Sequence, residues 1–266
     1  MTTAVVATDL DGTLVHSDGT ISPRTKAALA AASDAGALVV IATGRPPRWL
    51  PGVAEATGHH GLAICANGAL VLDLATEQII SSRPLAADVV LRLAASLRAA
   101  VPDIEFGVER VDGSFGHEPG YRPRWTPRPP AEIGDLDELV TEPVSKLLGR
   151  REGMGPDELL GLARAAVGES AATLTHSSID GLLEISALGV TKASTLAALL
   201  ADRGLSAQDV VAFGDMPNDV ELLSWAGLGV AVANAHPDVL AVADEITASN
   251  DDDGVAVVLE RLFAVA

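Results

Sequence analysis

The chain has little of what marks secreted and membrane proteins. Cys65 is the single cysteine among 266 residues, so no disulfide can form within the chain, and this usage is typical of a reducing cytosol. No apolar run approaches the roughly 20 residues that a membrane-spanning helix needs. The opening residues MTTAVVATDL have neither the basic region nor the cleavage site of a signal peptide. We therefore expect a cytoplasmic protein that does not enter a membrane.

Positive charge is also scarce. The chain has 18 basic and 36 acidic residues, which gives a net charge of -18, and such a surface repels nucleic acid and anionic membranes. The only lysines are Lys26, Lys146 and Lys192. An anionic ligand would need a metal or a few well-placed cations to attract it, so a lysine beside a motif is a candidate site residue.

The order of apolar and polar runs predicts two kinds of architecture. Apolar runs at 4–8, 37–43 and 62–65 alternate with helical stretches, a pattern typical of a parallel sheet covered on both faces. Between about residues 84 and 186, predicted strands have one polar face, which indicates an antiparallel sheet. We expect an α/β fold in which a Rossmann-like three-layer core, residues 1–83 and 187–266, is interrupted by an α+β insertion, residues 84–186.

Four predicted strands end in polar clusters. Because ligands of open parallel sheets bind at the carboxyl ends of the strands, these clusters should meet along one edge. Lys192 opens a predicted helix and could reach the same edge. The clusters are Asp9 with Asp11, Thr43 to Arg45, Asn67 with Gly68, and Asp215 with Asn218 and Asp219.

The residue types in these clusters point to phosphoryl transfer. Four carboxylates packed together would repel one another, and a hard cation such as Mg²⁺ with oxygen ligands relieves the repulsion. Lys192, Thr43 and loop amides would hold an anion. In phosphoryl transfer, a metal and cations neutralise the phosphoryl oxygens while a nucleophile attacks in line.

The motifs resemble those of the haloacid dehalogenase superfamily of aspartate-nucleophile phosphatases. DLDGTL at 9–14, ATGR at 42–45, the lysine of GVTKASTL at 189–196 and GDMPND at 214–219 match its four motifs in order. CANGA at 65–69 and NDDDGVA at 250–256 are similar to the Cof-type subfamily. In that subfamily a large α/β cap lies between the second and third motifs, which implies that residues 84–186 are the cap and determine substrate specificity.

The resemblance also implies roles for the site residues. Asp9 would be the nucleophile, and Asp11 the general acid and base, with its backbone carbonyl on the metal. The implied metal site is Asp9, Asp11, Asp215 and Asp219, the last supporting metal-bound waters. The implied phosphate- and substrate-binding residues are Thr43, Gly44, Arg45, Asn67, Gly68, Lys192 and Asn218.

The expected activity is Mg²⁺-dependent hydrolysis of a small phosphorylated metabolite through an aspartyl-phosphate, with a sugar phosphate as one candidate substrate. A phosphomutase or phosphotransferase of similar core, and a non-catalytic phosphate-binding protein, are the alternatives. Arg45 could contact substrate or pair with a core carboxylate. The loop with Arg122, Arg124 and Arg128 around Trp125 could select an anionic substrate, although a solvated proline-rich loop is the favoured interpretation. The histidines outside the motifs have no metal-ligand spacing and are expected in loops or at the surface.

Overall fold

A computed structural model describes residues 3–124, 126–127, 129–168 and 170–263. The chain divides into two compact units, the first comprising 1–45, 49–80 and 191–266, and the second 46–48 and 81–190. The first is built on a mainly parallel sheet and the second on a mainly antiparallel one, so the predicted fold class is confirmed. Trp125 and Arg128 lie outside the described residues. That the inserted unit determines specificity stays a prediction.

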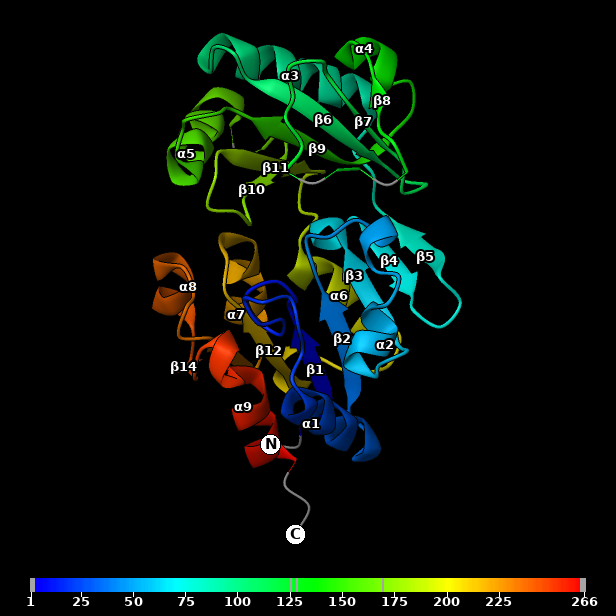
Figure 1. Ribbon diagram of the computed structural model, residues 1–266, viewed down its shortest axis with the longest axis vertical. Helices are drawn as coiled ribbons and strands as arrows, with labels where there is room; N and C mark the ends of the chain where they lie inside the picture. Colours follow the sequence, from blue (N-terminus) through cyan, green and yellow to red (C-terminus); the bar gives the residue numbers. More distant parts are fainter. Residues whose placement is uncertain (1–2, 125, 128, 169, 264–266) are drawn as a thin grey trace. The chain divides into compact units, whose positions relative to one another are not determined.

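The sheet of the first unit has eight strands in the order β14-β13-β12-β1-β2-β3-β4-β5. The strands from β14 to β3 pair in parallel, whereas β4 is antiparallel to β3 (Figure 1). The strands are β1 (Val5–Thr8), β2 (Leu38–Ala42), β3 (Leu62–Cys65), β4 (Leu70–Asp73), β5 (Gln78–Ser82), β12 (Val210–Gly214), β13 (Leu228–Ala231) and β14 (Glu245–Ile246).

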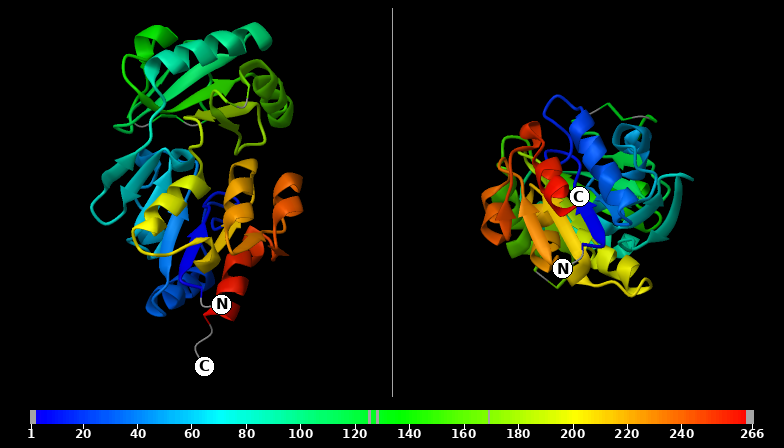
Figure 2. Two further views of the ribbon diagram at one scale, coloured as in Figure 1. Left: turned by 180° about the vertical axis from the view of Figure 1, so that it is seen from behind. Right: turned by 90° about the horizontal axis from the view of Figure 1, so that it is seen from below.

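Helices cover both faces of this sheet. Helices α1 and α9 lie together on one face, with α6 and α7 on the other (Figure 2). Helix α1 begins where the sequence predicts, because the Ser22 hydroxyl accepts a hydrogen bond from the Thr25 amide at 3.0 Å and Pro23 takes the first helical position. The helices are α1 (Pro23–Asp34), α2 (Val53–Thr57), α6 (Lys192–Ala201), α7 (Val220–Trp225), α8 (Pro237–Val242) and α9 (Gly254–Leu262).

The second unit has a six-stranded sheet in the order β10-β11-β9-β6-β7-β8. Its pairs are antiparallel except β7 with β8, which are parallel. The elements are α3 (Ala87–Ala100), β6 (Glu105–Arg110), β7 (Phe115–His117), β8 (Glu132–Ile133), α4 (Leu136–Leu139), β9 (Val144–Arg150), α5 (Pro156–Val167), β10 (Thr173–Thr175) and β11 (Leu182–Ser186).

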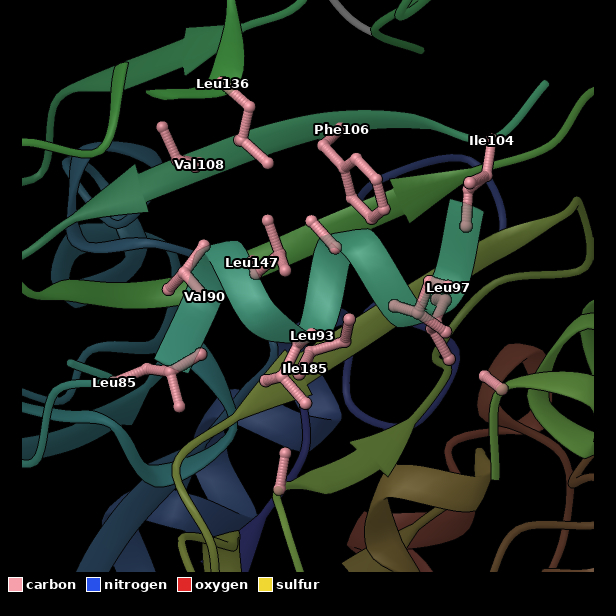
Figure 3. Packing of buried hydrophobic residues seen from close by; sticks show 14 of the residues in the cluster. Leu85, Val90, Leu93, Leu97, Ile104, Phe106, Val108, Leu136, Leu147 and Ile185 are labelled. Carbon is pink, nitrogen blue, oxygen red and sulfur yellow. The ribbon is translucent and has the colours of Figure 1, made fainter. Parts of the chain in front are cut away.

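One face of this second sheet carries a hydrophobic core. Val90, Leu93 and Leu97 lie one helical turn apart on α3 and pack with Phe106 of β6 and Leu147 of β9 (Figure 3). Each such buried side chain contributes about 1.5–3 kcal/mol to folding. The second unit therefore has a core of its own.

Three predictions from the sequence can be compared with the structure. The prediction that the histidines lie in loops or at the surface is wrong for His117, which is buried on β7, whereas His176 lies in the loop that follows β10, as predicted, although its side chain is buried. In the predicted arginine-rich loop, Arg122 donates to the carbonyls of Pro119 and Gly120 in the same loop. No helix among the described residues combines the length and hydropathy needed to cross a bilayer, and a cytoplasmic location stays a prediction.

Candidate active site

Four neighbouring strands bring the predicted polar clusters to one edge of the sheet. Strands β12, β1, β2 and β3 are adjacent and parallel. Asp215, Asp9 and Thr43 directly follow the first three, and Asn67 lies two residues beyond the fourth. Apolar strand interiors and polar strand ends therefore place these side chains at a common edge.

Three carboxylates and a lysine form the centre of the site. The Lys192 ammonium donates to Asp9 Oδ1 at 2.6 Å and to Asp219 Oδ1 at 2.7 Å. Oxygens of Asp9, Asp215 and Asp219 come within 4.8 Å of one another. All four side chains are buried. The lysine ends up here because it opens α6, whose preceding residue Thr191 caps the helix by accepting from the Ser194 amide at 3.1 Å.

The cluster is short of positive charge. Burial raises the pKa of Asp9 well above its ordinary range against the opposing effect of Lys192, and Asp219 and Asp215 raise it further. Burial, followed by the charge of Asp219, raises the pKa of Asp215 to about 7. Burial alone would lower the pKa of Lys192, but Asp219 and Asp9 together raise it. With all three acids ionised, one ammonium leaves two negative charges in excess, and a divalent cation would balance them. The buried oxygen donors fit a hard cation such as Mg²⁺.

Loop geometry fixes these acids. Asp219 Oδ2 accepts the backbone amides of Asp215 at 3.1 Å and Met216 at 3.2 Å, so this carboxylate closes the loop after β12. A Cβ on Gly214 would lie 2.4 Å from Asp219 Cβ, and one on Gly12 would lie 2.4 Å from Asp215 Oδ2. Both positions therefore need glycine for the acids to approach.

Asp11 lies apart from the three buried acids. Its side chain is 58% exposed. The Arg45 guanidinium forms a side-on ion pair with it, in which Nε donates to Oδ2 at 2.7 Å and Nη2 donates to Oδ1 at 2.5 Å. These bonds raise the pKa of Arg45 despite its partial burial. Arg45 thus pairs with a carboxylate, which is one of the two roles that the sequence leaves open for it.

The turn after β3 is a segment of left-handed backbone. Ala66, Asn67 and Gly68 have φ values of 50°, 58° and 107°. A Cβ on Gly68 would lie 2.3 Å from the Thr191 carbonyl oxygen, so glycine lets α6 approach. The Asn67 amide donates to the Thr43 carbonyl at 3.1 Å, which ties this turn to the end of β2.

Two amide side chains meet between the third and fourth clusters. Asn218 Nδ2 donates to Asn67 Oδ1 at 2.9 Å. Asn67 Nδ2 and Asn218 Oδ1 are buried without a hydrogen-bond partner among the described residues. A buried donor without a partner is costly, and an oxygen of a bound ligand would satisfy Asn67 Nδ2.

Sequence reasoning missed two supporting residues. The Thr13 hydroxyl donates to Asp215 Oδ1 at 2.7 Å. Asn234 donates to the Gly12 carbonyl at 2.8 Å and accepts from the Asn250 amide at 2.9 Å. Thr13 belongs to the first motif and Asn234 follows a predicted strand, so the position of each in the sequence could have identified it as a candidate site residue. These contacts hold the loop after β1 against the loops after β12 and β13.

The sequence and the fold are similar to those of known proteins. A family model described as haloacid dehalogenase-like hydrolase matches residues 6–259. The chain is 29% identical over 255 residues, 95% of its own length and 92% of the relative's, to 5-amino-6-(5-phospho-D-ribitylamino)uracil phosphatase of Bacillus subtilis. It is also 29% identical over 271 residues to pyridoxal phosphate phosphatase of Escherichia coli, covering 96% and 97% of the two chains. A solved haloacid dehalogenase-like hydrolase of Bacteroides thetaiotaomicron superposes with a TM-score of 0.76 at 27% identity, covering 97% and 98%.

Proposed function

The chain belongs to the haloacid dehalogenase-like hydrolase family, and from that premise we propose that it is a phosphatase that hydrolyses phosphoric monoesters of small metabolites at the Asp9 site. The observation that carries the proposal is the buried Lys192 ammonium, which contacts both Asp9 and Asp219 while Asp215 lies close by. This group can hold an anionic phosphoryl group beside a fixed carboxylate nucleophile.

The reaction would proceed in two steps. In the first, an Asp9 oxygen attacks phosphorus, the bond from phosphorus to the alcohol oxygen breaks, and Asp11 gives that oxygen a proton. In the second, Asp11 takes a proton from water, the water oxygen attacks phosphorus, and the bond to Asp9 breaks. The products are the alcohol and inorganic phosphate, and the intermediate is an aspartyl-phosphate on Asp9.

The other site residues would bind and orient the phosphoryl group. Lys192 would neutralise its charge, and the Thr43 hydroxyl and the amides of Gly44 and Gly68 would contact its oxygens. Asn67 Nδ2, which is buried without a partner among the described residues, is a further donor suited to a phosphoryl oxygen. Asn218 would hold the Asn67 amide in place through their 2.9 Å bond.

We propose Mg²⁺ as the cofactor, held by Asp9, Asp215 and the Asp11 backbone carbonyl, with Asp219 supporting its waters. When bound, the ion supplies charge neutralisation for the acids and for the phosphoryl oxygens. Oxygen-only donors favour this ion over softer metals, and its two positive charges match the deficit in the cluster.

The substrate is proposed to be a small phosphorylated metabolite, and sugar phosphates are the first class to test. Two relatives are named as phosphatases of a phosphoribitylamino compound and of pyridoxal phosphate. Release of inorganic phosphate from a panel of phosphorylated metabolites with Mg²⁺ tests the class. Retention of the phosphoryl group on product would indicate a phosphomutase instead.

The intermediate has its own test. Asp11→Asn lacks the base for the second step. An aryl phosphate has a leaving group that hardly needs an acid, so with this substrate the variant should release a burst of phenol and accumulate protein that carries a labelled phosphoryl group. The label should survive acid, be cleaved by hydroxylamine and map to Asp9. Undiminished turnover by Asp9→Asn, or label on another residue, would exclude this mechanism.

A further inference from the structure

The ion pair between Arg45 and Asp11 has the geometry of a clamp. Both oxygens of the Asp11 carboxylate accept from one planar guanidinium, at 2.7 Å and 2.5 Å. The clamp is anchored on the arginine side, because the Arg45 amide donates to the Thr43 hydroxyl at 3.1 Å and its carbonyl accepts the Ala66 amide at 2.9 Å. Arg45 thus links Asp11 to the turns that end β2 and β3.

Asp11 needs such a clamp more than the other acids do. Its side chain is 58% exposed, whereas Asp9, Asp215 and Asp219 are buried and fixed by neighbours. Among the described residues, the close group of acids consists of those three and does not include the Asp11 carboxylate. An exposed carboxylate without a fixed partner would sample several rotamers, and few of them would point at a leaving group.

We infer that Arg45 is a positioning residue, which acts on the reaction through Asp11 by fixing the orientation of its carboxylate. The inference rests on the proposed phosphatase function. The clamp uses one lone pair of each carboxylate oxygen and leaves the second one available. It differs from the role that the resemblance gives Arg45, which is direct contact with phosphate or substrate. Its Nε and Nη2 donors are engaged by Asp11 instead.

The two roles predict different kinetics for Arg45→Met. An alkyl phosphate needs an acid for its leaving group, whereas 4-nitrophenyl phosphate does not. A positioning role predicts that kcat/KM for the best alkyl phosphate falls about tenfold to a hundredfold. It predicts that kcat/KM for 4-nitrophenyl phosphate stays within about twofold, because formation of the intermediate from that ester needs no acid. The inhibition constant of inorganic phosphate should be unchanged, since no phosphate contact is lost.

A double-mutant comparison tests whether Arg45 acts only through Asp11. In an Asp11→Asn background, Arg45→Met should have no further effect on the alkyl phosphate, because the group it orients can no longer transfer the proton. Arg45→Lys keeps the charge without the planar fork and should retain only part of the alkyl activity. It also covers the case in which Arg45→Met folds poorly.

The chain offers a matched control. Arg24 makes the same side-on pair with Glu260, Nε to Oε1 at 2.8 Å and Nη2 to Oε2 at 2.7 Å, on helices α1 and α9. Arg24→Met should leave all three measurements unchanged.

Two results would overturn the inference: equal loss of kcat/KM for alkyl and aryl esters with weaker phosphate inhibition, or additive effects of Arg45→Met and Asp11→Asn. Wild-type protein that releases no phosphate from any ester would refute the proposed function instead, so the two failures are distinguishable.

Discussion

The raised pKa of Asp215 predicts how the stability of the metal-free protein depends on pH. Burial and the charge of Asp219 place this pKa at about 7, against an ordinary value of 3.8. Below pH 3.8 the carboxyl is protonated in both the folded and the unfolded state and contributes nothing. Between 3.8 and 7 the folded state keeps a proton that the unfolded chain has lost, so the free energy of unfolding falls as pH rises. Above 7 the loss is complete.

The size of the effect follows from the same two values. Each pH unit between them corresponds to about 1.4 kcal/mol, so the full loss is about 4 kcal/mol. Roughly 3 kcal/mol of it falls between pH 5 and pH 8. Asp215→Asn removes this contribution while keeping an acceptor for the Thr13 hydroxyl, which donates to Oδ1 at 2.7 Å.

The assay is urea unfolding in excess chelator at pH 5 and pH 8 for wild type and Asp215→Asn. The many surface acids affect both proteins alike, so the difference between them reports the titration of Asp215 together with its effect on the neighbouring Asp9. Wild type should lose about 3 kcal/mol more than the variant over this range. At pH 8, saturating Mg²⁺ at about 100 times its dissociation constant should restore about 2.7 kcal/mol to wild type. Equal pH dependence in the two proteins would refute the argument that burial and Asp219 keep Asp215 protonated.

Further predictions concern the metal, the phosphoryl site and the turn after β3. Chelator should abolish phosphate release and Mg²⁺ restore it, with Asp215→Ala raising the Mg²⁺ midpoint about tenfold or more; full activity in chelator contradicts the metal role. In wild type the same midpoint should fall as pH rises toward 7, because Mg²⁺ and a proton compete for Asp215, and a pH-independent midpoint counts against this. Lys192→Met should lower kcat/KM by about a hundredfold or more for alkyl and aryl esters alike, since it removes charge opposite the phosphoryl group; a loss confined to one ester class would contradict that. Gly68→Ala should lower the free energy of unfolding in urea titrations by about 1–3 kcal/mol, because Gly68 has a φ of 107° and an added Cβ would lie 2.3 Å from the Thr191 carbonyl oxygen. An unchanged free energy of unfolding would show that the turn can relax.

The positions of the site residues could be predicted because they coincide with the ends of buried strands. Asp9, Thr43 and Asp215 each follow a buried strand made mainly of apolar residues, and adjacent parallel strands bring their ends together. The proximity of Lys192 to Asp9 was less direct, since it depends on the approach of α6 to the turn at Gly68.

Other features had no such signal. Strands β7, β8, β10 and β14 have three residues or fewer, too short for a periodic pattern to develop. The burial of His117 and His176 comes from tertiary packing, which local composition does not predict. The side-on pairing of Arg45 with Asp11 depends on rotamers and on the turns that fix Arg45, and residue type alone left two partners open.

The pairing of β1 with β12 also bears on how the chain is made. Val5 lies opposite Val210 across this parallel pair. Strand β1 therefore cannot form the pair until β12, about 200 residues later in the chain, has been synthesised. On a ribosome, the inserted unit can complete its own core while β1 still presents an unpaired apolar edge. Such an edge invites pairing with other chains. Asp215 and Lys192 join the site only after β12 has paired with β1. We therefore expect newly made protein to become active only after the inserted unit has folded. Slower translation before residue 210 should prolong the time for which the chain needs chaperones.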